Sequence, residues 1–561
     1  MTPIYGIDLG TTYTKCAIVR VSDGQVEVFK LDRERPDSPQ NTLTILRSAV
    51  TVATTAGGRR AAYVGTRSLT EMEQWAEGDP EIRRFEEAKI YIGEDVSNAA
   101  GDPPPWRFDP HAWDYRPEDI GAIILRKLKR EVEAAGGPPM NRVVVTHPQY
   151  FSEARRQATR QAAEIAGLEI VDTLTEPDAA AILYGLDATA GRYMIFDIGG
   201  GTLDVTVVEI EAKRQSVLAS DGEKVGGRDF DRLIFARMVA EYQALYSEFD
   251  EAFLDERTRQ VWMREAERLK RQLNDPDQPL GRVRFQCQSA QFPDGRVKTV
   301  NIKREEFVAA TQPLVAQCIQ CAERALAAAR LTWPALSGVI CVGGTSRLNP
   351  LREALARVTD KVRPVEFDID TAIAHGAAIY AHRLSAKLGD GACPPTTPPA
   401  KTEVIAKIDG QRWEKPAAIA LDVELVGALA RGLGVKVRDP KAKRDVIYNL
   451  VPKDSALPYR ATKIFRTTER DRLEVELFEG EEADPELCEF LGEIDMSGVP
   501  LGPPGQPVEV TVEIEVSGAK HLVVEARGQR REAVIHFDPK RVLPEDELAK
   551  RRAFIASLLV F

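Results

Sequence analysis

Two short glycine loops constrain the fold of this chain more than any other feature. One covers residues 8–12 (DLGTT) and the other covers residues 197–202 (DIGGGT), and each lies between two apolar runs of strand length. An apolar run, a tight glycine turn and a second apolar run predict a β-hairpin at each place. Because glycine has no Cβ, the backbone N–H groups of such a turn can converge on an anion.

An aspartate opens each loop, Asp8 in the first and Asp197 in the second. A carboxylate repels a phosphate group unless a divalent cation lies between them, so the pair predicts two opposed loops around Mg²⁺ and a nucleotide. The sequence contains no Gly-Lys-Ser or Gly-Lys-Thr, which excludes a Walker-type phosphate loop. The loop residues expected to surround the phosphates are Gly10, Thr11, Thr12, Gly199, Gly200, Gly201 and Thr202.

Composition narrows the class of protein. The 561 residues are enough for three or four structural units. A formal net charge of −11 with no basic stripe argues against binding to nucleic acid. No stretch approaches the ~20 apolar residues of a membrane span, and no signal peptide is recognisable. We therefore expect no membrane partner. The seven cysteines form no disulfide framework, so we also expect a cytoplasmic location.

The chain divides into regions of different periodicity. Strand and helix signals alternate over residues 1–385, with helices expected at 116–134, 152–166 and 305–329, which predicts an α/β domain. Residues 386–417 are rich in proline and predict an extended linker, with a strand at 403–408 as one interpretation. Period-two alternation follows over 418–537, most clearly at 473–477 and 508–516, and predicts a β domain. Residues 538–561 predict a short helical tail.

Several of these segments together resemble the seventy-kilodalton heat-shock (DnaK-type) chaperone family. The similar segments of the first domain are residues 5–13 (YGIDLGTTY), 175–181 (TEPDAAA), 196–205 (FDIGGGTLDV) and 342–348 (VGGTSRL). In the β domain they are residues 457–458, Phe465, 478–481 (FEGE) and 492–516. The resemblance covers about 1–385 and 418–537. It implies an actin-like, duplicated ribonuclease H-like ATPase domain followed by a β-sandwich of the peptide-binding kind.

The resemblance also implies a function and partners. It implies a chaperone that couples Mg²⁺-dependent ATP binding and slow hydrolysis to the binding of unfolded polypeptide, with J-domain and nucleotide-exchange partners. From the residues alone two other classes stay open. One is an actin-like scaffold or a regulatory ATPase that binds one dedicated partner. The other is a small-molecule kinase of the same superfamily.

Roles in the site follow from the resemblance residue by residue. Lys89 is expected to reach the γ-phosphate, Glu176 to orient the attacking water, and Thr202 to contact the γ-phosphate. Asp8 and Asp197 are expected to hold Mg²⁺, and Tyr13 and Asp204 match positions near K⁺ sites. The residues expected around the adenosine are Glu267, Lys270 and Arg271 on one helix face, and Gly343, Gly344, Ser346, Arg347 and Asp370 opposite them.

The chain also departs from the family pattern. Phe465, Leu473 and Val475 align with an apolar peptide cleft, although the same residues at strand spacing are also typical of a plain sandwich core. Only residues 543–561 stand where the family has a long helical lid, so we expect bound peptide to leave fast. The linker is longer, and residues 417–423 are rich in alanine. Asp172 and Thr175 depart from the J-domain contact pattern, and Asn274 replaces a serine beside the adenosine.

Overall fold

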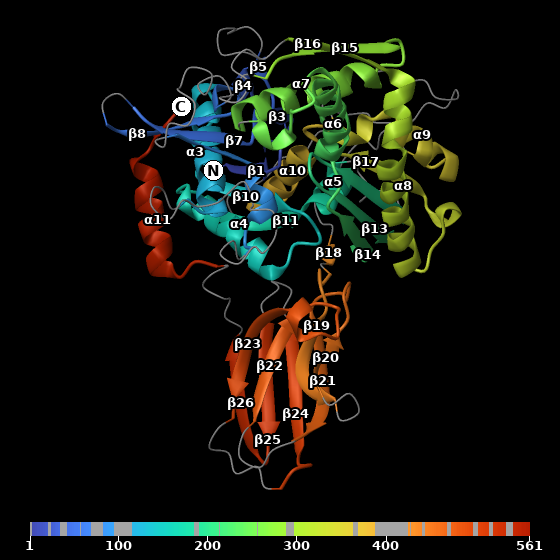
Figure 1. Ribbon diagram of the computed structural model, residues 1–561. Coiled ribbons are helices and arrows are strands. Elements are labelled where there is room, and N and C mark those ends of the chain that lie inside the picture. The colour runs from blue at the N-terminus through green and yellow to red at the C-terminus, as the bar shows by residue number, and fades with distance from the viewer. Residues whose placement is uncertain are drawn as a thin grey trace.

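The computed structural model describes most of the chain (Figure 1). The described residues are 3–20, 24–33, 42–55, 58–68, 82–94, 115–183, 190–211, 214–254, 256–287, 297–362, 369–387, 424–426, 428–439, 444–467, 473–496, 503–514, 520–534 and 542–561. Nearly all of the expected linker, including the strand interpretation at 403–408 and the alanine-rich segment 417–423, lies outside them.

The first glycine loop lies in a mixed sheet. Its strand order is β11-β10-β1-β2-β3, with the short β6 also paired to β2. Strands β1, β2 and β3 form an antiparallel meander. Strand β10 pairs parallel with β1, and β11 pairs parallel with β10. The strands are β1 (Ile4–Asp8), β2 (Tyr13–Val19), β3 (Val26–Val28), β6 (Leu46–Arg47), β10 (Arg142–His147) and β11 (Glu169–Thr175).

The second glycine loop lies in a sheet with the same pattern. Its order is β17-β12-β13-β14-β18, in which β12, β13 and β14 form an antiparallel meander and β17 pairs parallel with β12. The two predicted hairpins are therefore confirmed, and they occupy equivalent places in two similar sheets. The strands are β12 (Gly191–Ile198), β13 (Leu203–Glu211), β14 (Arg214–Glu223), β17 (Gly338–Val342) and β18 (Glu424–Val426).

Two helices pack between these sheets, α5 (Glu176–Leu183) and α10 (Ala372–Lys387). Their alanine-rich faces share one apolar core with strands of both sheets. Glycine makes this packing close, because a Cβ on Gly6 would overlap the α10 backbone at Ala378 and a Cβ on Gly376 would overlap the α5 backbone at Ala179. The close approach brings the carboxyl ends of β1 and β12, and hence both loops, to the same cleft.

The outer helices follow the sequence predictions closely. The helices expected at 116–134, 152–166 and 305–329 are α3 (Pro117–Ala134), α4 (Glu153–Ile165) and α8 (Arg304–Ala328). Cys318 and Cys321 lie buried in the apolar core beneath α8, and the described residues contain no group of three metal-ligating side chains. None of the described helices is both long and apolar enough to span a bilayer.

Two smaller units close the cleft from above. On one side, β7 (Ala49–Thr54), β8 (Arg60–Val64) and β9 (Ile82–Glu86) form an antiparallel sheet that leads into the short α2 (Ala88–Tyr91). On the other side, an aromatic core that includes Tyr242, Phe249 and Trp262 joins α6 (Gly227–Leu245) and α7 (Glu256–Asn274) to the hairpin of β15 (Leu280–Phe285) and β16 (Lys298–Lys303).

The β domain consists of two antiparallel four-stranded sheets around one apolar core (Figure 1). Strand β24 alternates as predicted, with Val508, Val510 and Val512 buried between the sheets. The first sheet, in order, is β20 (Arg444–Val451), β19 (Leu433–Asp439), β22 (Glu474–Glu479) and β23 (Glu489–Asp495). The second is β21 (Tyr459–Arg466), β24 (Pro507–Ile514), β25 (Lys520–Ala526) and β26 (Gln529–Val534).

The C-terminal segment differs from the expected helical tail in both structure and position. Helix α11 (Glu545–Ser557) ends four residues early, and β27 (Leu559–Val560) pairs parallel with the edge strand β8. The helix lies beside α3 and α4 rather than on the sandwich (Figure 1). The expectation of helix up to residue 561 is wrong because the last residues gain backbone hydrogen bonds to β8, including Phe561 N to Ala62 O at 2.8 Å.

Candidate functional site

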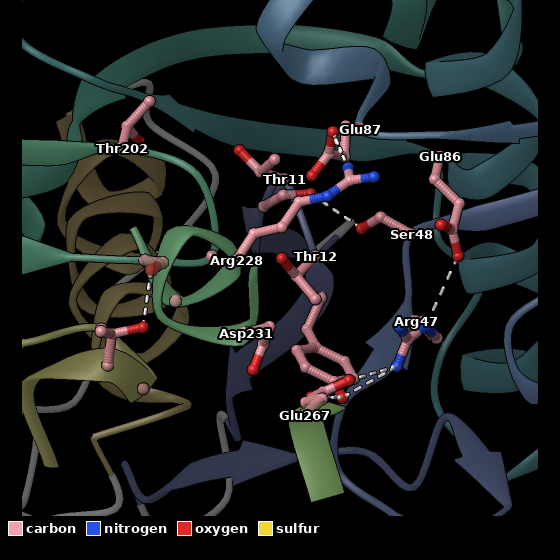
Figure 2. Close-up of a pocket in the computed structure, with 18 of the residues that line it drawn as sticks. Thr11, Thr12, Arg47, Ser48, Glu86, Glu87, Thr202, Arg228, Asp231 and Glu267 are labelled. Atoms are coloured by element: carbon pink, nitrogen blue, oxygen red, sulfur yellow. Dashed lines mark hydrogen bonds and ion pairs between the residues drawn. The ribbon is translucent and has the colours of Figure 1, made fainter. Parts of the chain in front are cut away.

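A cavity of about 800 Å³ lies where the two similar sheets meet, within the ~300–1,000 Å³ range of small-molecule sites. Both glycine loops line it, together with α2, α6, α7 and the loop after β17. Figure 2 shows Thr11 and Thr12 of the first loop near the centre of the view, with Thr202 of the second loop and Glu267 of α7 around them.

The two loops touch each other. A Cβ on Gly200 would overlap the hydroxyl oxygen of Thr12, and a Cβ on Gly201 would lie 3.5 Å from the Thr11 methyl group. Gly10 is equally confined, because its Cβ would overlap the carbonyl oxygen of Tyr13. Glycine is thus required for the loops to approach each other from opposite sides, as the sequence predicted.

Neighbouring elements hold the second loop in place. The Thr345 hydroxyl donates to the carbonyl oxygen of Gly199 at 2.7 Å. The backbone N–H of Arg228 donates to the carbonyl oxygen of Gly200 at 2.8 Å. Gly343 adopts φ +77°, and a Cβ there would lie 2.6 Å from an Asp197 carboxylate oxygen. These bonds use the carbonyls of the loop. The amide of Gly199 closes the turn on Thr202 O at 3.0 Å.

Acidic and basic side chains meet below the loops. The Lys15 ammonium lies 2.8 Å from a carboxylate oxygen of Asp8, and Lys89 of α2 forms an ion pair with Glu176 at the start of α5. Burial raises the pKa of Glu176, and Lys89 lowers it by a smaller amount. Burial lowers the pKa of Lys89, but Glu176, Asp8 and Asp197 together raise it, so the ammonium stays charged beside Glu176.

Asp197 has no basic partner among the described side chains, unlike Asp8 and Glu176. Among the described residues it forms no ion pair, and its pKa is raised well above the ordinary value by burial and then by Glu176, Asp8 and Asp204. Burial also raises the pKa of Asp204 to about 7. Of these four carboxylates, Asp8 and Glu176 each have a lysine partner, so a divalent cation would relieve the repulsion that remains. The donor set therefore fits Mg²⁺, which prefers carboxylate oxygens and water.

The helix face expected around the adenosine is already occupied by ion pairs. The Glu267 carboxylate forms ion pairs with the guanidinium groups of Arg47, at 3.4 Å, and Arg271, at 2.5 Å. Figure 2 shows the Arg47 side chain extending toward Glu267. Lys270 is buried and pairs with Asp231 at 2.8 Å. On the facing wall, Arg347 pairs with Asp370 at 2.5 Å.

Asn274, which departs from the family pattern, joins the two walls of this adenosine region. Its side-chain N–H donates to Arg347 O at 2.9 Å, and its side-chain oxygen accepts the backbone N–H of Asn349 at 2.7 Å. The side-chain amide of Asn349 donates in return to the backbone carbonyl oxygen of Asn274 at 2.5 Å. The end of α7 is thereby tied to the loop that precedes α9 (Asn349–Val358).

The structure brings nearly all of the predicted nucleotide-site residues to one cavity. Gly201 and Ser346 are the predicted residues that do not line it. Ser346 is buried and its hydroxyl donates to Gly343 O at 2.7 Å, so it shapes the loop from within. The predicted residues that line the cavity are Asp8, Gly10, Thr11, Thr12, Tyr13, Lys89, Glu176, Asp197, Gly199, Gly200, Thr202, Asp204, Glu267, Lys270, Arg271, Gly343, Gly344, Arg347 and Asp370.

Sequence reasoning missed several charged residues that line the site, among them Lys15, Arg47, Arg228 and Asp231. Arg47 is nearly buried and comes from β6, a strand of two residues that carries no periodic signal. Lys15 did carry a signal, since a charged residue in an otherwise apolar hairpin strand points to a buried partner. The glycine pair at 226–227, where α6 begins, was another usable signal.

The predicted peptide-cleft residues come from both sheets of the sandwich. Val475 of β22 is buried in the shared core, while Phe465 of β21 and Leu473 are partly buried against it. The Phe465 ring meets that of Tyr448 edge to face at 5.4 Å, and Ile464 beside it is 60% exposed. The residue set thus comprises one buried core residue and two partly buried residues, drawn from both sheets.

Comparison with known proteins gives a family. The family model described as Hsp70 protein matches residues 77–391 and 424–554. The mitochondrial-type heat shock protein 70 of Encephalitozoon cuniculi (strain GB-M1) is 27% identical over 558 residues, which is 98% of this chain and 85% of that protein. The chaperone protein DnaK of Thermotoga maritima is 29% identical over 555 residues, which is 98% of this chain and 82% of that protein.

Proposed function

Because the chain belongs to the Hsp70 family, we propose that it is an ATP-hydrolysing molecular chaperone. In this proposal residues 1–385 form an actin-like ATPase domain, residues 386–417 a linker, and residues 418–537 a sandwich that binds extended segments of unfolded polypeptide. Residues 538–561 form a tail attached to the ATPase domain. The observation that carries the proposal is the single cavity in which both glycine loops and the buried carboxylates meet. No observation favours a scaffold or a small-molecule kinase. The cytoplasmic location stays a prediction.

The cavity supports specific roles in nucleotide binding. Asp8 and Asp197 would hold Mg²⁺, which when bound neutralises the charge of the triphosphate and of the leaving diphosphate. The backbone amides of residues 10–12 and 200–202 would donate to phosphate oxygens from opposite sides. Tyr13 and Asp204 stay candidates for a K⁺ site, and Asp204 already accepts the backbone N–H of Gln149 at 2.8 Å.

Hydrolysis needs positioning and charge more than covalent chemistry. Glu176 would orient the attacking water and accept its proton, a role that fits a carboxylate with a raised pKa. Lys89 is already held beside Glu176, and its ammonium would stabilise the charge that develops on the γ-phosphate oxygens. Thr202, at the end of the second loop, would contact the same phosphate from the opposite side.

The two walls above the phosphates would hold adenosine. Glu267, Lys270 and Arg271 present one polar face, and the loop 343–347 with Asp370 presents the other. Because Arg47 joins Glu267 from across the cleft, this region would close over a bound base. The hydrogen bonds of Asn274 would keep the two walls at a fixed spacing.

A short chain of contacts links the cavity to the sandwich. Asp204 accepts the backbone N–H of Gln149, and the buried Gln149 side chain donates to Ala428 O at 3.4 Å. Strand β18 adds to the edge of β14, and Ser220 of β14 donates to Asp454 at 3.0 Å. We propose that nucleotide-dependent shifts of the cavity reach the peptide region through these contacts.

The ATPase proposal is tested by phosphate release from the full chain. Lys89→Ala and Asp197→Ala should each lower turnover on the order of 10²-fold, because each removes a charge aimed at the phosphates. Lys303→Ala, which changes an exposed lysine on β16, should leave turnover unchanged. Equal turnover in all four proteins would reject the assigned site.

The chaperone proposal is tested with a fluorescent peptide library. Peptide should bind to the sandwich more weakly in ATP than in ADP, and Gln149→Met should reduce that difference while the chain still hydrolyses ATP. Phe465→Asp should weaken peptide binding in both nucleotides. Equal peptide affinity in ATP and ADP would remove the coupling, and an unaltered affinity in Phe465→Asp would move the peptide site elsewhere.

A further inference from the structure

The phosphate cavity contains a lysine that the proposed function does not use. Lys15 lies on β2, directly after the first glycine loop, and its side chain is 15% exposed on the cavity floor. Its Nζ lies 3.4 Å from the point that a Cβ of Gly10 would occupy, so the ammonium sits against the base of that loop. A charged side chain in this otherwise apolar strand calls for a polar partner in the cavity.

Asp8 is that partner. The Lys15 ammonium donates to Asp8 at 2.8 Å, and this is its one hydrogen bond within the described part of the chain. A lysine ammonium carries three N–H donors, so two remain available to the cavity. Lys89 pairs with Glu176 on the same cavity floor, so each of the two lysines has its own carboxylate partner.

We propose that Lys15 is a second phosphate-binding lysine of this site, which holds Asp8 while the cavity is empty and turns to the phosphate oxygens when Mg²⁺ takes Asp8. The proposal rests on the nucleotide-binding function proposed above. Mg²⁺ and an ammonium group repel each other, so a metal bound at Asp8 weakens the hold of that carboxylate on Lys15. The phosphates offer the displaced ammonium charge-assisted hydrogen bonds within reach of the same loop.

The competing account is that Lys15 only neutralises Asp8 and never meets the nucleotide. The two accounts separate in a background where Asp8 has no charge. Asp8→Asn removes the carboxylate that Lys15 would neutralise, so any remaining effect of Lys15 on nucleotide affinity comes from its own contact with phosphate. Measurement in EDTA removes the metal from the comparison.

The test is calorimetric titration of ADP, in EDTA, into Asp8→Asn and into the double variant Asp8→Asn with Lys15→Met. The double variant should bind ADP about 10-fold more weakly, which is the loss expected for one charge-assisted hydrogen bond. Lys15→Arg in the same background should keep most of the affinity, because it keeps the charge. Lys303→Met is the matched surface control.

Each outcome decides between the accounts. Equal ADP affinity in the single and double variants overturns the phosphate role of Lys15. A thermal unfolding midpoint is recorded for every variant, and Lys15→Gln replaces Lys15→Met if the latter does not fold. If the wild-type chain fails to bind ADP with Mg²⁺ present, the proposed function itself fails, which is a separate result from equal affinities in the two variants.

Discussion

The nucleotide cleft and the C-terminal attachment both join segments that are far apart in the sequence, but they do so with different forces. Across the cleft, Arg47 pairs with Glu267 at 3.4 Å on the edge of a large cavity, and it also pairs with Glu86 of β9 at 3.9 Å. At the attachment, Ile555 is fully buried, and Leu558 and Val560 are nearly so, in the core beneath α3 and β8.

The difference indicates which of the two sets of contacts a ligand can replace. Ion pairs beside a solvent-filled cavity contribute about 0–1 kcal/mol each, and a ligand can replace them. A buried aliphatic side chain contributes about 2–5 kcal/mol relative to alanine, and nothing in solution substitutes for it. We therefore expect the cleft to open and close with nucleotide while the C-terminal segment stays attached.

Polar contacts reinforce the attachment. The Gln161 side chain both accepts from Leu543 N at 2.9 Å and donates to Leu543 O at 2.6 Å. Arg551 pairs with the buried Asp119 at 3.0 Å, and the Phe554 ring lies 5.4 Å from that of Tyr115. The segment is thus fixed at its beginning, middle and end, the last through β27.

The largest expected effect breaks the attachment. Ile555→Ala should lower the free energy of unfolding by about 2–5 kcal/mol, because it leaves a cavity in a closely packed core. Urea unfolding measures this loss. Lys550→Ala, on an exposed face of the same helix, should change the value by no more than about 0.5 kcal/mol. Equal, small effects of both variants would show that the segment is only loosely held.

A pH effect sharpens the comparison. Burial raises the pKa of Asp119 from 3.8 to about 7, with Arg551 and the Arg116 backbone acting against the rise. The folded state therefore binds the extra proton, and the stability contributed by Asp119 is complete below pH 3.8 and lost by about pH 7.

The matching variant is Asp119→Asn, which cannot titrate. Relative to wild type, its unfolding free energy should rise between pH 3.8 and about pH 7, by at most about 1.4 kcal/mol per pH unit. Urea unfolding at several pH values gives the difference. A difference that does not vary with pH would mean that Asp119 stays ionised beside Arg551.

The smallest effect on stability is expected in the cleft. Arg47→Ala removes two ion pairs, so it should change the unfolding free energy by no more than about 2 kcal/mol. It should nevertheless speed the release of a fluorescent ADP in stopped-flow, since Arg47 bridges the two sides. Arg357→Ala, an exposed residue of α9, is the control. An unchanged release rate would show that the bridge does not restrain the nucleotide.

The sequence predicted the elements that depend on local patterns of apolar and turn residues. Both hairpins, α3, α4, α8 and the sandwich strands β22 and β24 follow from apolar period and turn residues. The phosphate-loop residues of the cavity came from the glycine motifs, and the other site residues came from the family resemblance. Position in space was not encoded in this way. The pairing of β27 with β8 joins Val560 to Ala62, and two residues are too few to show a strand period. Arg47 and Asp231 entered the site only through folding.

The central claim is that both glycine loops form one Mg-nucleotide site, and the contact between Gly200 and Thr12 tests it most directly. Calorimetric titration of ADP with Mg²⁺ should show one binding site per wild-type chain. Gly200→Ala should weaken binding at least about 10-fold, because the new Cβ would push the loops apart. No binding by the wild-type chain, or equal binding by Gly200→Ala, would contradict the account.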